Sequence, residues 1–240
     1  MDLGRESLEE DVPALIARAD RAHTESRGLR ITANAAAAIE KALAMSPDDA
    51  ALEWRFARAY LTLANAVPSQ TLGLRFARQA RMHAMNCGTH APELPACAYF
   101  EAAAAGIAAT LNPSAAAQFQ QDIEAPAERL VELDASYERG GGLRILGALY
   151  ARAPAWPAGV GDLEEGVELL ERAAREHPGH PLNHFFLAEA YARSGQIHAA
   201  TLAYRAVLEA PVTGEWNLIG APYRGKAQSR LEALTRELAP

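Results

Sequence analysis

The 240-residue chain has few of the features that mark an enzyme, a metal protein or a membrane-spanning protein. It has only two cysteines, and no apolar run approaches the roughly 18 residues of a membrane-spanning helix. A serine nucleophile elbow, an H-E-x-x-H zinc motif and a phosphate-binding loop are all missing from the sequence. We therefore expect no catalytic residue, no metal, no cofactor and no membrane span.

Strand-forming residues are also scarce. Aromatic residues make up 7% of the chain, and no convincing run of alternating β-branched residues occurs, whereas alanine is abundant. Alanine is the best helix former, and strands favour aromatic and β-branched residues. Because 50% of the residues are hydrophobic, the chain can bury a sizeable core. The composition predicts an all-α protein.

Charge of one sign is not concentrated anywhere. The net charge is −7, from 30 acidic and 23 basic residues spread along the chain, which argues against a nucleic-acid surface. Met1 to Asp20 is acidic and lacks the basic start and apolar centre of a secretory signal. We expect a soluble chain that is cytoplasmic as given, or periplasmic if a signal was removed, so the compartment stays open.

A pattern recurs between Gly140 and Pro211. Leu146-Gly147-Ala148-Leu149-Tyr150 matches Leu187-Ala188-Glu189-Ala190-Tyr191, with a small residue three positions before each tyrosine. We call this small residue the notch, because it lets a neighbouring helix approach while the tyrosine fills the gap beside it. Between the copies, Gly166, Leu170 and Ala173 share one face of a second helix, which Pro178 ends. Each unit is therefore a helical hairpin.

Such hairpins bury their apolar faces only by stacking. Further notches at Ala57 and Gly106 precede those at Gly147 and Ala188, in steps of 49, 41 and 41 residues. We predict about ten helices in one α-α superhelix over residues 1–240, with the strongest repeats in 140–211. Residues 1–11 are expected to fray, 86–95 to form a loop, 134–142 to form a connector, and 223–238 to form a capping helix.

The hairpins resemble tetratricopeptide repeats, although those recur at about 34 residues. The loop Ala153 to Asp162, APAWPAGVGD, follows GGGLRILGALYAR and precedes a helix ending at His177-Pro178. This combination resembles the T-component family of tripartite ATP-independent periplasmic (TRAP) transporters over Gly140 to Pro211. The resemblance implies a helical-repeat protein, often periplasmic and lipid-anchored, that oligomerises, docks a solute-binding protein and passes it small carboxylate or hydrophobic ligands.

In tetratricopeptide arrays the first helices line an inner groove. Transferring that geometry predicts a binding groove that contains Trp54, Arg58, Phe100, Arg144, Phe185 and Glu189. Aromatic rings beside arginines would suit an apolar ligand or a peptide ending in a carboxylate, because guanidinium binds carboxylate through two hydrogen bonds. The alternative is that the arginines are solvated and the aromatic residues belong to the core.

The loop around Trp156 also has two interpretations. In the one that we favour, prolines stiffen the loop, Trp156 covers an edge of the core and Asp162 caps the next helix. In the other, Trp156 is an exposed docking anchor for a partner.

Cysteine and histidine residues suggest only weak sites. His83, Cys87, His90 and Cys97 have the spacing H-x3-C-x2-H-x6-C, which lacks the paired short spacings of a zinc site. In an exported protein we expect Cys87 and Cys97 to form a disulfide, and in the cytosol two thiols. A nucleophile–base pair of Cys87 with His90 and an acid–base pair of Glu189 with His184 are the remaining enzyme hypotheses.

The leading function hypothesis is a non-catalytic docking scaffold similar to the T-component. It would bind a solute-binding protein and hold a small anionic or apolar ligand. The second hypothesis is a cytoplasmic adaptor that binds a peptide or helix in the same groove. The third is an uncharacterised enzyme.

Overall fold

The computed structural model describes residues 11–25, 28–211 and 216–237. Over these residues the chain is all-α, as the composition predicts, with eleven α-helices and one 3-10 helix, η1. The helices are α1 (Val12–Glu25), α2 (Leu29–Met45), α3 (Ala50–Ala66), α4 (Gln70–His90), α5 (Pro95–Leu111), η1 (Pro113–Phe119), α6 (Gln120–Asp134), α7 (Gly141–Tyr150), α8 (Leu163–Glu176), α9 (Pro181–Arg193), α10 (Ile197–Glu209) and α11 (Trp216–Glu237). The expectation of a frayed start falls mostly on residues 1–10, which lie outside the described residues.

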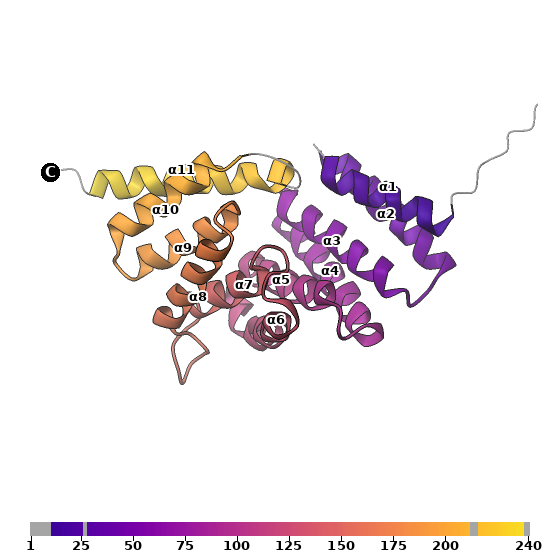
Figure 1. Ribbon diagram of the computed structural model, residues 1–240, viewed down its shortest axis with the longest axis horizontal. Coiled ribbons are helices and arrows are strands. Elements are labelled where there is room, and N and C mark those ends of the chain that lie inside the picture. Colours follow the sequence, from indigo (N-terminus) through magenta and orange to yellow (C-terminus); the bar gives the residue numbers. More distant parts are fainter. Residues whose placement is uncertain (1–10, 26–27, 212–215, 238–240) are drawn as a thin grey trace, which may run out of the picture.

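Consecutive helices pair into antiparallel hairpins, and the hairpins stack into an arc (Figure 1). The odd-numbered helices from α1 to α11 each contact the next odd-numbered helix. Within the described residues, no even-numbered helix makes comparable contact with the next even-numbered one. Because only one layer is in close contact from hairpin to hairpin, the stack curves with the odd-numbered helices on its inner side.

Local sequence sets where the helices begin. Asp49 caps α3 by accepting a hydrogen bond from the Ala51 amide at 2.8 Å, and Asp162 caps α8 by accepting from the Glu164 and Glu165 amides at 3.1 Å each. The predicted cap at Asp162 is thus confirmed. Pro95 and Pro181 occupy the first turns of α5 and α9, where a missing amide hydrogen costs nothing.

The notch of α7 is a true point of close helix contact. A Cβ atom added to Gly147 would lie 2.6 Å from Cγ of Leu170 and 2.9 Å from the Gly166 carbonyl oxygen on α8. A Cβ atom on Gly166 would lie 2.7 Å from the Ala151 backbone nitrogen. Two facing glycines therefore allow the backbones of α7 and α8 to touch.

The notch predicted at Gly106 is wrong. A Cβ atom there would meet nothing within 4 Å, whereas the preceding Ala105 is fully buried. In the alanine-rich α5 many positions are small, so sequence similarity could not show which of them faces the neighbouring helix. Ala57 and Ala188 are both fully buried, as their predicted role requires.

Two predicted boundaries differ from the structure. α4 continues to His90 through the first half of the loop expected over 86–95. It ends just before Pro92, which disfavours helical geometry at Ala91. The last helix begins at Trp216 rather than Tyr223, so Pro222 lies inside the helix and not before it. A proline removes only its own backbone hydrogen bond, so the helix continues through that position at some cost.

Helix α11 also joins distant parts of the chain. It packs along α9 and α10 and contacts α3, on the opposite arm of the arc. Figure 1 shows it running across the open side of the arc, from the α10 end toward the top of α3. The last helix therefore does more than cap the final hairpin.

Candidate functional site

The structure brings three of the predicted groove residues together around Trp54. The Trp54 and Phe100 rings are stacked with centroids 5.9 Å apart, and Phe100 is buried. The guanidinium carbons of Arg55 and Arg58 lie 4.2 and 5.0 Å from the Trp54 ring centroid, which is cation–π geometry. The indole is thus already sandwiched by the protein's own side chains.

Arg58 is paired within the protein. Its Nη2 lies 2.6 Å from the Asp20 carboxylate of α1, and Arg55 Nε lies 3.0 Å from the same oxygen. Burial of the Asp20 carboxyl raises its pKa, but the hydrogen bonds and charges of Arg55 and Arg58 outweigh this effect and hold the pKa below its usual value. The two arginines therefore fasten α1 to α3.

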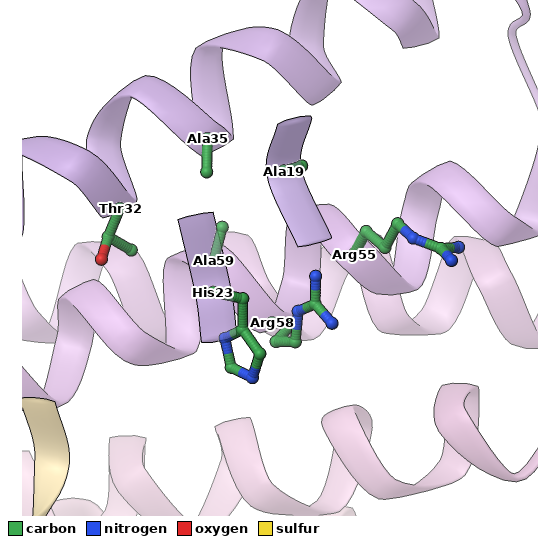
Figure 2. Close-up of a pocket in the computed structure, with 7 residues that line it drawn as sticks. All are labelled: Ala19, His23, Thr32, Ala35, Arg55, Arg58 and Ala59. Carbon is green, nitrogen blue, oxygen red and sulfur yellow. The ribbon is translucent and has the colours of Figure 1, made fainter. Parts of the chain in front are cut away.

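A small pocket adjoins this ion pair (Figure 2). Ala19 and His23 of α1, Thr32 and Ala35 of α2, and Arg55, Arg58 and Ala59 of α3 line it. Its volume is about 10 Å³, which is close to the minimum for one water molecule. This pocket is thus too small for an organic ligand.

Arg144 is buried and supports a turn. Its side chain is 3% exposed, and Nη1 donates to Asn183 Oδ1 at 2.7 Å and to the Glu138 carbonyl at 3.3 Å. Glu138, Arg139 and Gly140 have φ values of 48°, 54° and 80°, which for the two non-glycine residues is strained. The amide of Asn183 donates to the Arg139 carbonyl at 3.1 Å. Arg144 and Asn183 thus hold the carbonyls of a left-handed turn at the start of α7.

Phe185 and Glu189 belong to a second group, formed by α9, α10 and α11. Phe185 is buried, and its ring centroid lies 5.0 Å from that of Tyr223. Glu189 accepts a short hydrogen bond from the Tyr204 hydroxyl and lies 3.2 Å from Arg230 Nε. Its carboxylate is therefore already bound, and burial together with this bond raises the pKa of Tyr204.

Arg152 is an inner arginine that the sequence reasoning missed. Its guanidinium carbon lies 5.0 Å from the Phe186 ring centroid, and within the described residues it forms no ion pair at salt-bridge distance. The side chain stays exposed, yet the helices around it displace enough water to lower the pKa of the guanidinium. The repeat carried a signal that could have found it, because Tyr150-Ala151-Arg152 recurs as Tyr191-Ala192-Arg193.

Trp156 lies at the tip of the loop between α7 and α8 and is 86% exposed. The expectation that it covers an edge of the core is therefore wrong. The two ends of the loop reach the core, where Ala153 and Val160 pack against the cluster of Ala105, Ile123 and Leu149, but its tip does not. Most of its indole is therefore accessible for contact with another molecule.

Hydrogen bonds fix the loop that carries Trp156. The Gly161 amide donates to the Pro154 carbonyl at 2.8 Å, and the Ala158 amide to the Ala155 carbonyl at 3.1 Å. The Val160 amide donates to Oε1 of the buried Gln120 on α6 at 3.2 Å. The loop is thus closed on itself and attached to α6, so that Trp156 is presented in a defined position.

The structure argues against the predicted cysteine and histidine chemistry. Cys87 and Cys97 form a disulfide, so Cys87 is not a thiol that His90 could activate. His83 Nδ1 lies 2.5 Å from Glu53 Oε2, and within the described residues no group of His, Cys, Asp and Glu side chains could hold a metal ion. His184 Nε2 contacts the Pro178 carbonyl at 2.7 Å, so that it and Glu189 have separate partners.

Membrane insertion of a helix finds no support in the described part of the chain. None of the helices there is both long and apolar enough to cross a bilayer.

Comparison with known proteins relates the chain to solved structures only. No family model matches it, and no curated protein sequence does. TTC0263, a thermophilic TPR protein from Thermus thermophilus, superposes with a TM-score of 0.65 at 16% identity, over 92% of this chain and 98% of that chain. Human IFIT1, solved as a dimer with m7Gppp-AAAA, gives a TM-score of 0.59 at 17% identity, over 95% of this chain and 50% of that chain. The chain therefore has a tetratricopeptide-like fold.

Proposed function

We propose that this protein is a non-catalytic scaffold that docks a partner protein through Trp156. The observation that carries the proposal is the 86% exposure of a tryptophan on a loop fixed by hydrogen bonds. Exposed tryptophans concentrate binding energy at protein interfaces, and a loop already held in place loses little entropy when it binds. No such unsatisfied anchor occurs among the predicted groove residues, whose polar atoms are bonded within the protein.

The proposed partner is a solute-binding protein, as for the T-component of TRAP transporters. The support is the position of Trp156 inside the segment Gly140 to Pro211 that carries the resemblance. The disulfide of Cys87 and Cys97 adds to it, because disulfides persist in oxidising compartments such as the periplasm. Self-association is part of the same proposal, since the T-component family oligomerises.

A small carboxylate or apolar ligand is a second and weaker proposal. Arg58 and Arg144 are committed to internal partners, so the inner-side arginine best suited to a carboxylate is Arg152. A cytoplasmic adaptor remains the alternative for the same fold. The enzyme hypothesis loses its two named residue pairs, because Cys87 is oxidised and Glu189 is bound to Tyr204.

The test is a pull-down from an extract of the native source with the full chain as bait. Trp156→Ala is compared with Leu202→Ala, which removes another exposed apolar side chain from α10. We expect a solute-binding protein among the proteins that the wild type and Leu202→Ala retain and Trp156→Ala loses. Identical captures by all three baits would contradict docking through Trp156, and a set of cytosolic proteins alone would favour the adaptor.

A further inference from the structure

Carboxylates flank the Trp156 loop on both sides. Gln120, which holds the loop, is followed at steps of four by Glu124 and Glu128, so all three share one face of α6. On the other side, the loop ends at Asp162, the N-cap of α8, and Glu164 and Glu165 lie in the first turn of that helix. The flanking carboxylates, which we call the acidic rim, are Glu124, Glu128, Asp162, Glu164, Glu165 and Glu168.

The two arms of the acidic rim converge near Tyr150, the last residue of α7. Its hydroxyl is hydrogen-bonded to Glu124 and interacts electrostatically with the charges of Glu128 and Glu165. Burial raises the pKa of Tyr150 first, and these three carboxylates raise it further, because each opposes a negative phenolate. Carboxylates of α6 and α8 thus lie within electrostatic range of one point at the base of the loop.

The acidic rim has no basic partner within the described residues. Elsewhere on the surface, carboxylates pair with arginines, as Glu176 does with Arg172 at 2.8 Å and Asp122 with Arg81 at 2.6 Å. No rim residue forms an ion pair at such a distance with a described cation. The rim's negative potential therefore extends into solvent at the base of the Trp156 loop.

We propose that Trp156 inserts into an apolar pocket of a partner protein whose margin carries lysine and arginine side chains. The inference rests on the proposed docking function and adds the chemistry of the partner surface. The indole would supply the buried contact area, and the acidic rim would attract the partner's cations, which speeds encounter and excludes acidic competitors.

Two other possible binding partners of the Trp156 loop fit the charge of the acidic rim less well. An anionic membrane surface would be repelled by the six carboxylates of the acidic rim, even though tryptophan itself favours membrane interfaces. At this loop, a second copy of this chain would meet the acidic rim with a net charge of −7, which opposes the contact, so the proposed self-association uses another surface. A basic protein surface is the occupant that the rim favours.

The first experiment replaces Trp156 with the photo-reactive amino acid p-benzoylphenylalanine in the full chain. Irradiation in native extract links the loop covalently to whatever lies against it, and mass spectrometry identifies the linked peptide. The same amino acid at Leu202, which is 51% exposed on α10, is the matched control. We expect position 156 to link to a surface segment of another protein in which apolar residues adjoin lysines or arginines.

Each of the other outcomes would refute one part of the proposal. A crosslink to an acidic or uncharged surface of another protein would refute the basic pocket while leaving docking intact. A crosslink to lipid or to a second copy of this chain would refute docking of a partner protein through Trp156. Crosslinking at 156 no greater than at 202 would refute the docking function itself. The two failures are therefore distinguishable.

A second experiment uses the purified partner found by crosslinking. The double variant Glu164→Gln, Glu165→Gln should slow association about tenfold at low salt, and the loss should vanish at high salt. The double variant Glu40→Gln, Glu93→Gln changes two exposed carboxylates far from the loop in the sequence and should associate like wild type. Equal association rates for both double variants would refute the role of the acidic rim.

Discussion

The inner arginines and Trp156 differ in how many contacts their side chains make within the protein. Arg58 and Arg144 look like ligand-binding residues in the sequence, yet one is bound to Asp20 and the other to Asn183 and a strained turn. Trp156 looks like a core residue, yet it is 86% exposed on a loop fixed by its own hydrogen bonds. Residues that could recognise a partner are those whose contacts within the fold are incomplete.

The largest effect on stability is expected at Arg144. Arg144→Met would leave Asn183 Oδ1 and the carbonyls of the left-handed turn without their donor in a buried site. We expect a loss of about 3 kcal/mol in unfolding free energy, measured by urea denaturation. The control Arg205→Met alters an exposed arginine of α10 and should change stability by less than about 0.5 kcal/mol. Similar small losses for both variants would mean that Arg144 is not structural.

The next largest effect is expected at Gly147. Gly147→Ala places a methyl group 2.9 Å from the Gly166 carbonyl and 2.6 Å from Leu170, so α7 and α8 must move apart. We expect a loss of about 1–3 kcal/mol, and a larger loss for Gly147→Leu. Gly106→Ala enters open space within a helix and should stabilise the protein by about 0.5–1 kcal/mol. Thermal unfolding that shows the same sign for both alanine variants would contradict the helix contact at Gly147.

The effect at Asp20 is smaller and depends on pH. Because Arg55 and Arg58 hold the pKa of Asp20 below its usual value, the pair adds stability above the unfolded pKa of about 3.9. This stability disappears as the pH falls through the lowered pKa, when the carboxylate gains a proton. Asp20→Asn should therefore cost less than about 1 kcal/mol at pH 7, since the pair is partly exposed, and nothing in strong acid. A constant difference across the whole pH range would show that the charge is irrelevant.

The fold could be predicted from the sequence because its signals are local. The steps between Gly147, Gly166 and Leu170 report helix faces that pack on one another, and Asp49 and Asp162 mark helix starts through their own side chains. These interactions join residues close in the chain, so their spacing can be recognised in the amino-acid sequence. The notch predicted at Gly106 was wrong because, among many alanines, the spacing of small residues does not show which of them faces the neighbouring helix.

The site could be predicted only in part, because its state depends on contacts between distant residues. Arg58 meets Asp20 across 38 positions, and Arg144 meets Asn183 across 39, so no local pattern shows that either arginine is occupied. The exposure of Trp156 likewise depends on hydrogen bonds that close its loop and attach it to α6, including one from Val160 to Gln120 across 40 positions. Aromatic and basic residue types suggested a binding surface, but only the three-dimensional contacts separate bonded side chains from available ones.

The central claim is that partner docking uses the Trp156 loop rather than the inner arginines. The most direct test measures the Kd of the purified partner for Trp156→Ala and for Arg58→Ala, with the unfolding free energy of each variant determined alongside. We predict that Trp156→Ala binds at least about 30-fold more weakly and unfolds like wild type, whereas Arg58→Ala binds normally. Normal binding by Trp156→Ala, or a comparable loss in Arg58→Ala, would contradict the account.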